Sequence, residues 1–532
     1  MIMKCKRFLS AILMLMCLTS LFACSNSNSS KDQGKETVNA QSTSGQQKEN
    51  PLLADDESKQ YSYVIMQGKQ FDVTPGNPTE KFLEQKFNAK FEFMLVPRGS
   101  NEVDYKNKLN LLMASGSDLP DLMQLNDIGI EQRFVEQGLL MPLDELVAKY
   151  GQEMIKIRPP ETWEVFKFNG KLFSLPNQYN PSSAVPYIRK DWLDKLGMSV
   201  PETMEQFEAV IKAFTEKDPD GNGKNDTYGI SGPNTPILDS FLNAFLYEGI
   251  HFDGWVLRDG KLAHASTLPE AKNALKRINN WYRNGWIDPR FPLMYRDKFE
   301  EIIGEGKFGS YFFDLQRIDP AFDIGLKTLY DRDPKAYFTT SPPIKDKKGE
   351  QHLYTGDFRS LGYTMAISAK CKNPARLMKM INYAASEEGY MRIRYGVKGV
   401  NYTIDDKGTV KYIPPWDDIN KRTQEGLSIQ YSNLFRREWE DKAASPEVWK
   451  GKDIVKKYGS SRSPIFTTTP AMIKSNTILN QLRDDTFTKI IVNKGDMDID
   501  KAFDDFVAKW KADGGNDITR EINDEYGKSA KK

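Results

Sequence analysis

The chain has 532 residues, of which 39% are apolar and 28% charged, a composition typical of a globular protein with sizeable cores. Its length allows about two to four domains. The 74 Lys and Arg residues nearly balance the 73 Asp and Glu residues, which argues against an extended nucleic-acid-binding surface. With only three histidines, the sequence also argues against multi-histidine metal catalysis.

The N-terminal residues have the layout of a bacterial export signal. Three basic residues precede an apolar run from Phe8 to Phe22, which is too short and too close to the terminus to suggest a membrane-spanning helix. The run ends in Leu21-Phe22-Ala23-Cys24, which resembles the lipobox of bacterial lipoproteins. This resemblance implies that residues 1–23 are removed and that the Cys24 thiol carries a lipid. The alternative is an ordinary signal peptide with a chance cysteine.

Residues 24–57 are expected to form a flexible tether. From Ser25 to Asn50 the chain consists largely of Ser, Asn, Gln, Lys, Gly and Thr, which offer almost nothing to bury. A lipid anchor and a tether together predict a protein held at the cell membrane, on its extracytoplasmic face. Beyond the lipidated cysteine only Cys371 remains, so no internal disulfide is expected.

The body of the chain begins with alternating strand and helix patterns. In chain order the periodicity predicts a strand at 61–66, a helix at 79–88, a strand at 90–96, a helix at 104–114 and a strand at 121–125. This order and spacing predict a mainly parallel sheet covered by helices. Ligands on such sheets bind beyond the carboxyl ends of the strands. Gln67 and Asn126, each directly after a strand, are therefore expected near one edge.

The remaining sequence contains more helical patterns than strand patterns. Strands are predicted at 185–190, 307–313 and 361–368. Helices are predicted at 203–217, 237–248, 267–285, 294–304, 374–385, 470–493 and 498–512. The fold class is therefore α/β, with a helical C-terminal part.

Four segments of the sequence form recognisable motifs: Met113–Leu122, Tyr187–Gly197, Trp281–Pro289 and Glu305–Ser310. In this order they resemble segments of bacterial extracellular solute-binding proteins. Behind a lipobox, this set resembles family 1 of these proteins, the substrate-binding lipoproteins of carbohydrate ABC importers, in their long variant. The resemblance implies a binding protein rather than an enzyme, with an oligosaccharide ligand and an ABC permease as partners.

The resemblance also implies the domain organisation. Two lobes of a periplasmic-binding-protein-like fold would be joined by crossing strands near 183–190 and 361–368, and they would close on ligand by hinge motion. The N-terminal lobe would comprise 58–183 and about 366–412. The C-terminal lobe would comprise 184–365 and about 413–532.

One loop has the ligand spacing of an EF-hand calcium site. Asp218, Asp220, Asn222 and Asp226 supply side-chain oxygens, and Lys224 supplies a backbone carbonyl, around a glycine that permits the tight turn. The acidic residue that closes such a loop is missing, because Gly229 stands at its last position and Thr227 where similar family loops carry an acid. The spacing predicts one structural calcium ion, and the alternative is an Asp/Gly-rich surface turn.

Sugar rings offer apolar faces and a rim of hydroxyl groups, so their sites combine aromatic side chains with amide, carboxylate and guanidinium groups. Loops and strand ends are where the walls of a cleft are expected, and several residues there have suitable side chains. For each of them, ordinary packing is the alternative. The candidates are Gln67, Asn126, Gln178, Tyr179, Trp255, Tyr311, Phe313, Arg359 and Trp416.

Two other functions remain open on the sequence alone. A cell-surface glycoside hydrolase needs two carboxylates, and 73 acidic residues do not exclude such a pair. A peptide-binding receptor lipoprotein would need an acidic anchor for the terminal amine of its ligand. Common nucleophile and zinc signatures of hydrolases do not occur.

Overall fold

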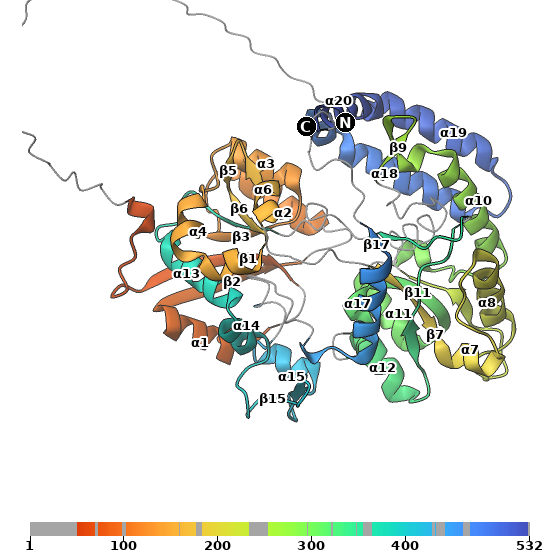
Figure 1. Ribbon diagram of the computed structural model, residues 1–532, viewed down its shortest axis with the longest axis horizontal. Helices are drawn as coiled ribbons and strands as arrows, with labels where there is room; N and C mark the ends of the chain where they lie inside the picture. The colour runs from red at the N-terminus through yellow and green to blue at the C-terminus, as the bar shows by residue number, and fades with distance from the viewer. Residues whose placement is uncertain are drawn as a thin grey trace, which may run out of the picture. The chain divides into compact units, whose positions relative to one another are not determined.

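The computed structural model (Figure 1) describes the following residues: 50–69, 73–97, 103–158, 160–176, 184–232, 254–294, 296–320, 323–346, 348–354, 364–427, 431, 442–460 and 469–529. They belong to a compact unit that spans Glu49–Lys532. Among the described helices, none combines the length and the apolar character that crossing a membrane requires.

The first of two main sheets has five strands in the order β2-β1-β3-β14-β6. These strands are β1 (Tyr61–Gly68), β2 (Ala89–Val96), β3 (Leu122–Leu125), β6 (Ser174–Pro176) and β14 (Thr364–Ile367). Strands β1, β2 and β3 run parallel, as the sequence predicts, whereas β14 is antiparallel to both of its neighbours. Successive residues of β14 enter different cores: Met365 and Ile367 pack in one, and Ala366 in the other. This alternation is the period of two that a sheet covered on both faces requires.

Helices cover the two faces of this sheet. They are α1 (Pro78–Phe87), α2 (Val103–Ser115), α3 (Ile128–Glu136), α4 (Asp144–Tyr150), α5 (Gln152–Ile157), α6 (Pro160–Val165), α13 (Pro374–Ala385) and α14 (Glu387–Arg394). Helices α4, α5 and α13 contact one another and share a core with Ile65 and Met365. The core on the other face contains Leu109 of α2 and Phe134 of α3. Two small hairpins complete this part: β4 (Lys167–Phe168) with β5 (Lys171–Leu172), and β15 (Tyr402–Ile404) with β16 (Val410–Tyr412).

The second main sheet has four strands in the order β12-β7-β11-β8. They are β7 (Ala184–Arg189), β8 (Tyr228–Ile230), β11 (Phe308–Asp314) and β12 (Phe338–Thr340). Strand β11 runs parallel to β8 and antiparallel to β7. The helices of this part are α7 (Lys190–Leu196), α8 (Met204–Glu216), α10 (Pro269–Arg283), α11 (Arg296–Glu305), α12 (Ile324–Arg332) and α17 (Pro446–Tyr458).

The C-terminal residues are helical, as expected. Helices α18 (Pro470–Val492), α19 (Ile499–Trp510) and α20 (Asn516–Ser529) share a large core with α10 and with the hairpin of β9 (Trp255–Arg258) and β10 (Lys261–His264). Figure 1 shows α18 and α19, in blue, beside α10. The α/β fold with a helical C-terminal part is thus confirmed, and of the predicted helices only 237–248 lies outside the described residues.

The chain passes between the two main sheets more than once. It leaves the first sheet after β6 and enters the second at β7, and it returns to the first at β14, after β13 (Leu353–Tyr354). A further passage lies at Ala443 and Ala444. Ala443 packs against the cluster of Tyr390 and Tyr402, whereas Ala444 belongs to the core of the second sheet. Two lobes joined by several short segments are therefore the architecture of this chain.

The last residues of the segment expected to be a flexible tether are instead fastened to α13 by a buried ion pair of Asp55. The Asp55 carboxylate lies 2.7 Å from the Arg376 guanidinium and 2.9 Å from the Lys379 ammonium, and its side chain is only 2% exposed. Burial opposes ionisation of Asp55, but the hydrogen bonds from Arg376 and Lys379 outweigh it and hold the pKa below its ordinary value. Lys379 also binds Glu57 at 2.7 Å, and that carboxylate is 77% exposed.

This arrangement predicts unequal effects for two substitutions that share the partner Lys379. Asp55→Asn leaves the buried Arg376 charge without its carboxylate and should cost about 3 kcal/mol of unfolding free energy. Glu57→Gln removes only an exposed pair and should cost less than about 1 kcal/mol. Urea unfolding of both variants measures the difference, and equal losses would contradict the role given to Asp55.

The same pair predicts a pH dependence. Because the pKa of Asp55 is lowered by folding, its contribution is present above the pKa of an unfolded aspartate and is lost as the pH falls through the folded value. The stability difference between wild type and Asp55→Asn should therefore shrink below about pH 4. A difference that stays constant from pH 7 to pH 3 would argue against an ionised Asp55.

Candidate functional site

One edge of the first sheet gathers the ends of strands that are far apart in the sequence. Because β3 and β6 both run antiparallel to β14, they finish at the edge where β14 begins, and β1 finishes there too. Thr364 pairs with both Leu125 and Pro176, and the β1–β3 register brings Gly68 to the same level. This carboxyl edge is where parallel sheets bind ligands.

Polar groups at this edge are buried and hydrogen-bonded. Gln67 is fully buried, and the next backbone amide, of Gly68, donates to the Gln124 side-chain oxygen at 3.0 Å. The Tyr105 hydroxyl donates to the Gln124 carbonyl at 2.7 Å. Asn126 is partly buried at the end of β3, directly before Asp127, whose side chain caps α3. The structure thus brings Gln67 and Asn126 to one edge, as their positions after two strands predicted.

Glu131 of α3 joins three elements of this edge. Its carboxylate accepts hydrogen bonds from the Ser174 hydroxyl of β6 and from the Thr364 hydroxyl of β14, the latter at 3.1 Å. All three side chains are buried. Nothing in the sequence indicates this contact, because Glu131 and Thr364 are 233 positions apart. The carboxylate therefore holds two hydroxyl groups in place and makes this edge of the first sheet rigid.

A second polar network lies at the start of α1, after the loop that follows β1. Asn77 caps this helix, with its side-chain oxygen accepting from the Thr79 and Glu80 amides. The Asn77 amide donates to the Tyr431 hydroxyl at 2.6 Å, and that hydroxyl donates to the Glu80 carboxylate at 2.5 Å. Asn77 directly before Pro78 is a recognisable helix start. The partner Tyr431 could not be foreseen, since it lies 354 positions away.

Trp416 is connected to this network. Its indole N–H donates to the Glu425 carboxylate at 2.8 Å, and the Glu425 carbonyl accepts from the Thr79 hydroxyl at 3.4 Å. Burial would raise the pKa of Glu425, but hydrogen bonds from Lys421 and Trp416 hold it below its ordinary value, so the carboxylate is ionised at neutral pH. The Trp416 side chain is partly exposed. An aromatic ring held by its N–H in this way keeps a fixed orientation.

Three other aromatic candidates lie inside packed cores, and one of them, Trp255, lies on a strand where a loop was expected. Trp255 is part of β9, where its ring packs edge-on at 5.1 Å from His264 within the helical core. Tyr311 and Phe313 are two apart on β11 and therefore point to the same face. Both rings pack at 5.5 Å from the Phe299 ring and are no more than 3% exposed. Core packing thus accounts for these positions in the structure, and a ligand contact of these residues stays a prediction.

The candidates Gln178, Tyr179 and Arg359 lie outside the described residues. In the sequence, Gln178 and Tyr179 precede β7, and Arg359 precedes β14.

The loop with calcium-like spacing connects α8 to β8, and its polar groups are engaged with one another. Asp218 accepts from the backbone amides of Gly221, Asn222 and Gly223 at 2.9–3.0 Å. The Asn222 amide donates to the carboxylates of Asp220 and Asp226. Within the described ranges, the acidic groups of this loop do not form a set of three with ligand atoms within 4.8 Å of one another.

The missing closing acid has no substitute in this loop. A side chain on Gly229 would clash with Ile211, because its Cβ would lie 2.5 Å from the Ile211 carbonyl oxygen. The Thr227 hydroxyl points inward and donates to the Phe214 carbonyl at 2.7 Å. In addition, the Lys307 ammonium contacts Asp220 and Asp226 at 3.1 and 2.7 Å. These residues do not fit the full oxygen shell that a tightly bound calcium ion takes.

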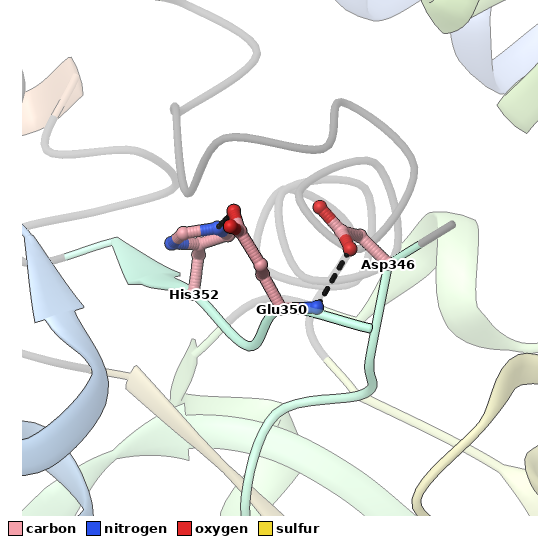
Figure 2. Close-up of side chains that lie close together, drawn as sticks. All are labelled: Asp346, Glu350 and His352. Atoms are coloured by element: carbon pink, nitrogen blue, oxygen red, sulfur yellow. Dashed lines mark hydrogen bonds and ion pairs between the residues drawn. The ribbon is translucent and has the colours of Figure 1, made fainter. Parts of the chain in front are cut away.

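Asp346, Glu350 and His352 are the described acidic and histidine side chains that do converge within 4.8 Å. Figure 2 shows that they lie on one turn, where the Glu350 amide donates to Asp346 at 2.8 Å. The same Asp346 oxygen accepts from the Lys348 amide, and His352 contacts Glu350 at 3.2 Å. Turn formation accounts for this group without a metal ion.

Comparison with known proteins places this geometry in a family. The sequence profile described as bacterial extracellular solute-binding protein matches residues 73–391. The polygalacturonan/rhamnogalacturonan-binding protein YtcQ of Bacillus subtilis (strain 168) is 24% identical over 463 residues, covering 85% of this chain and 88% of YtcQ. Lipoprotein LipO of the same organism is 24% identical over 473 residues, covering 85% and 89%.

A solved structure has the same fold. The ABC-transporter substrate-binding protein FusA of S. pneumoniae, as an EF-hand mutant in complex with fructo-nystose, superimposes with a TM-score of 0.67 at 20% identity. The match covers 89% of this chain and 100% of FusA. The two-lobe fold, its sheet with a polar carboxyl edge and the profile match lead to one conclusion: the chain belongs to the bacterial extracellular solute-binding protein family.

Proposed function

We propose that this chain captures an oligosaccharide between its two lobes and delivers it to the permease of an ABC transporter. The observation that carries the proposal is the rigid polar edge of the first sheet in a member of the solute-binding family. Relatives that bind polygalacturonan or carry fructo-nystose support a saccharide as the ligand class. No covalent chemistry is required, because delivery needs only that the ligand favour the closed state.

On the first lobe, we assign ligand contacts to Gln67, Asn126 and Trp416. The amides of Gln67 and Asn126 lie at the carboxyl edge, where donors and acceptors match sugar hydroxyl groups. Trp416 offers a partly exposed ring whose N–H is already engaged by Glu425. Gln178, Tyr179 and Arg359 remain proposed contacts, because in the sequence they shortly precede β7 and β14.

The lobe boundaries follow from the packing of the C-terminal half. The sequence suggested a change of lobe near residue 413. Tyr431, however, packs in the core of the first sheet, and Ala444 in that of the second. We therefore propose that the N-terminal lobe comprises about 50–183 and about 364–443, and that the C-terminal lobe comprises about 184–363 and about 444–532.

We propose that Cys24 carries the lipid that holds the protein at the outer face of the cell membrane. The lipobox-like Leu21–Cys24 and the polar residues after it support this anchor, as does the lipoprotein relative LipO. A bound diacylglycerol with a further acyl chain gives stable anchoring, because each buried methylene contributes about 0.8 kcal/mol.

For the loop of Asp218, Asp220, Asn222, Lys224 and Asp226, we propose that calcium binds only weakly. The FusA relative has an EF-hand, which supports some cation affinity in this fold. Here calcium would have to displace an ammonium group from two of the carboxylates. Its dissociation constant should therefore lie at about 10⁻³ M or above, the weak end of extracellular calcium sites.

The ligand assignment predicts a specific thermal response. A panel of plant and microbial oligosaccharides should contain at least one that raises the melting temperature, whereas peptides of similar size should not. Differential scanning fluorimetry followed by calorimetric titration tests this. Stabilisation by peptides and by no saccharide would overturn the carbohydrate proposal. Release of shorter saccharides during the incubation would indicate a hydrolase.

The role of Trp416 has a matched control in Trp449, which is on α17 and 50% exposed. Trp416→Ala should weaken saccharide binding at least about tenfold, which corresponds to about 1.4 kcal/mol. Trp449→Ala should leave the affinity unchanged, because that ring is on a surface helix with no proposed ligand contact. Calorimetric titration of both variants decides, and equal affinities would remove Trp416 from the site.

The anchor predicts a change of location. Cys24→Ser removes the thiol that would be acylated, so the protein should appear in the culture supernatant and lose labelling by a fatty-acid probe. Cys371→Ser is the control, because that thiol is buried. A Cys24→Ser protein that stays labelled and membrane-bound would contradict the anchor.

A further inference from the structure

Lys307 reaches into the loop whose spacing predicts calcium. It precedes β11 and comes from a different part of the chain, 81 positions beyond Asp226. Its ammonium lies 3.1 Å from one oxygen of Asp220 and 2.7 Å from one oxygen of Asp226. The same Asp220 oxygen accepts from the Asn222 amide at 2.9 Å. A cation that belongs to the protein thus bridges two of the three carboxylates.

A second lysine holds the opposite end of the loop. Lys195 of α7 donates to the carbonyl oxygens of Asp218 and Pro219, at 3.3 and 2.9 Å. The Lys195 ammonium packs closely against the loop backbone: a Cβ on Gly221 would lie 2.6 Å from this ammonium group. Gly221 also has a positive φ of 74°, which favours glycine at this position. The loop is therefore fastened to two neighbouring elements by ammonium groups.

The electrostatics agree with this geometry. The Lys307 side chain is 30% exposed, so its charge is partly shielded from water. Burial would lower the pKa of Lys307, but the hydrogen bonds to Asp226 and Asp220 raise it above its ordinary value. The hydrogen bond from Lys307 in turn lowers the pKa of Asp226. Both pKa directions agree with the ion pair that the geometry shows between Lys307 and Asp226.

We propose that the Lys307 ammonium serves as the structural cation of the 218–226 loop in place of calcium. This goes beyond the proposed transport function, because it concerns how the second lobe keeps its fold. The loop joins α8 to β8, and Lys307 begins the turn into β11, so the ammonium ties these three elements together. A calcium ion can dissociate or be chelated, whereas a side chain cannot.

The physical reason is competition for the same oxygens. Calcium needs six to eight oxygen ligands, and this loop lacks the closing acid that would supply two of them. A monovalent ammonium needs only a few acceptors, and Asp220 and Asp226 supply them. With Lys307 in place the loop should stay folded without metal. Without it, the uncompensated carboxylates should attract calcium.

The test is Lys307→Met, with Lys224→Met as its control. Lys224 is in the same loop and exposed, so its substitution removes the same charge without breaking the contacts of Lys307. Melting temperatures are measured in EDTA and in millimolar calcium, and calcium binding is measured by titration calorimetry.

We expect wild type and Lys224→Met to melt within about 1 °C in EDTA and in calcium. Lys307→Met should melt at least about 2–4 °C lower in EDTA, recover in calcium and bind calcium at least about tenfold more tightly than wild type. A wild-type protein that loses stability in EDTA and regains it with calcium would overturn the proposal. So would a Lys307→Met protein with wild-type stability and calcium affinity.

A second variant covers the case in which Lys307→Met does not fold. Lys307→Gln keeps a hydrogen-bond donor at a similar position but removes the charge. Folding of either variant only when calcium is present would support the proposal. Failure of both variants to fold even in calcium would contradict the proposal, because calcium would then be unable to replace the lost ammonium charge.

Discussion

The direction of the strands in the first sheet is the constraint on which the candidate site depends. Parallel strands of one sheet end at the same edge, so their last residues and the loops that follow lie near one another. Strands β1, β3 and β6 meet this condition, and β14 runs the other way but begins there. Four segments spread over about 300 positions of the chain therefore bring their polar residues to one place.

The buried polar contacts make that place rigid. Glu131 holds hydroxyl groups of β6 and β14, and the Asn77–Tyr431–Glu80 network holds the start of α1. A buried polar group is costly unless its partners are present, so each network favours one arrangement. Rigid lobes are what a hinge-closing binding protein needs, because closure then concentrates the motion in the few segments that join them.

The sequence predicted what depends on local pattern and on chain order. The alternation of strands and helices predicted the parallel sheet. Gln67 and Asn126 directly follow strands in the sequence pattern, which predicted that they lie at the same edge of this sheet. Tyr311 and Phe313 lie on β11, as the pattern predicted, but strand periodicity shows only that two residues share a face and not that this face meets the core. Trp255 packs in a core built largely by the C-terminal helices, a contact no local pattern records.

Contacts between residues that are far apart in the sequence could not be predicted, because local patterns do not record them. The spacing of 218–226 indicated a calcium loop. Lys307, directly before β11, places an ammonium group against two of the carboxylates of this loop. Tyr431 likewise completes the start of α1 from 354 positions away. In both cases the residue types were visible in the sequence, and only the fold shows that they meet.

Transport by this protein requires its two rigid lobes to close on a saccharide. Small-angle X-ray scattering of the protein, with and without a saccharide shown by calorimetry to saturate it, measures this closure. We expect a smaller radius of gyration for the saturated protein. Superimposable scattering profiles at full saturation would contradict it.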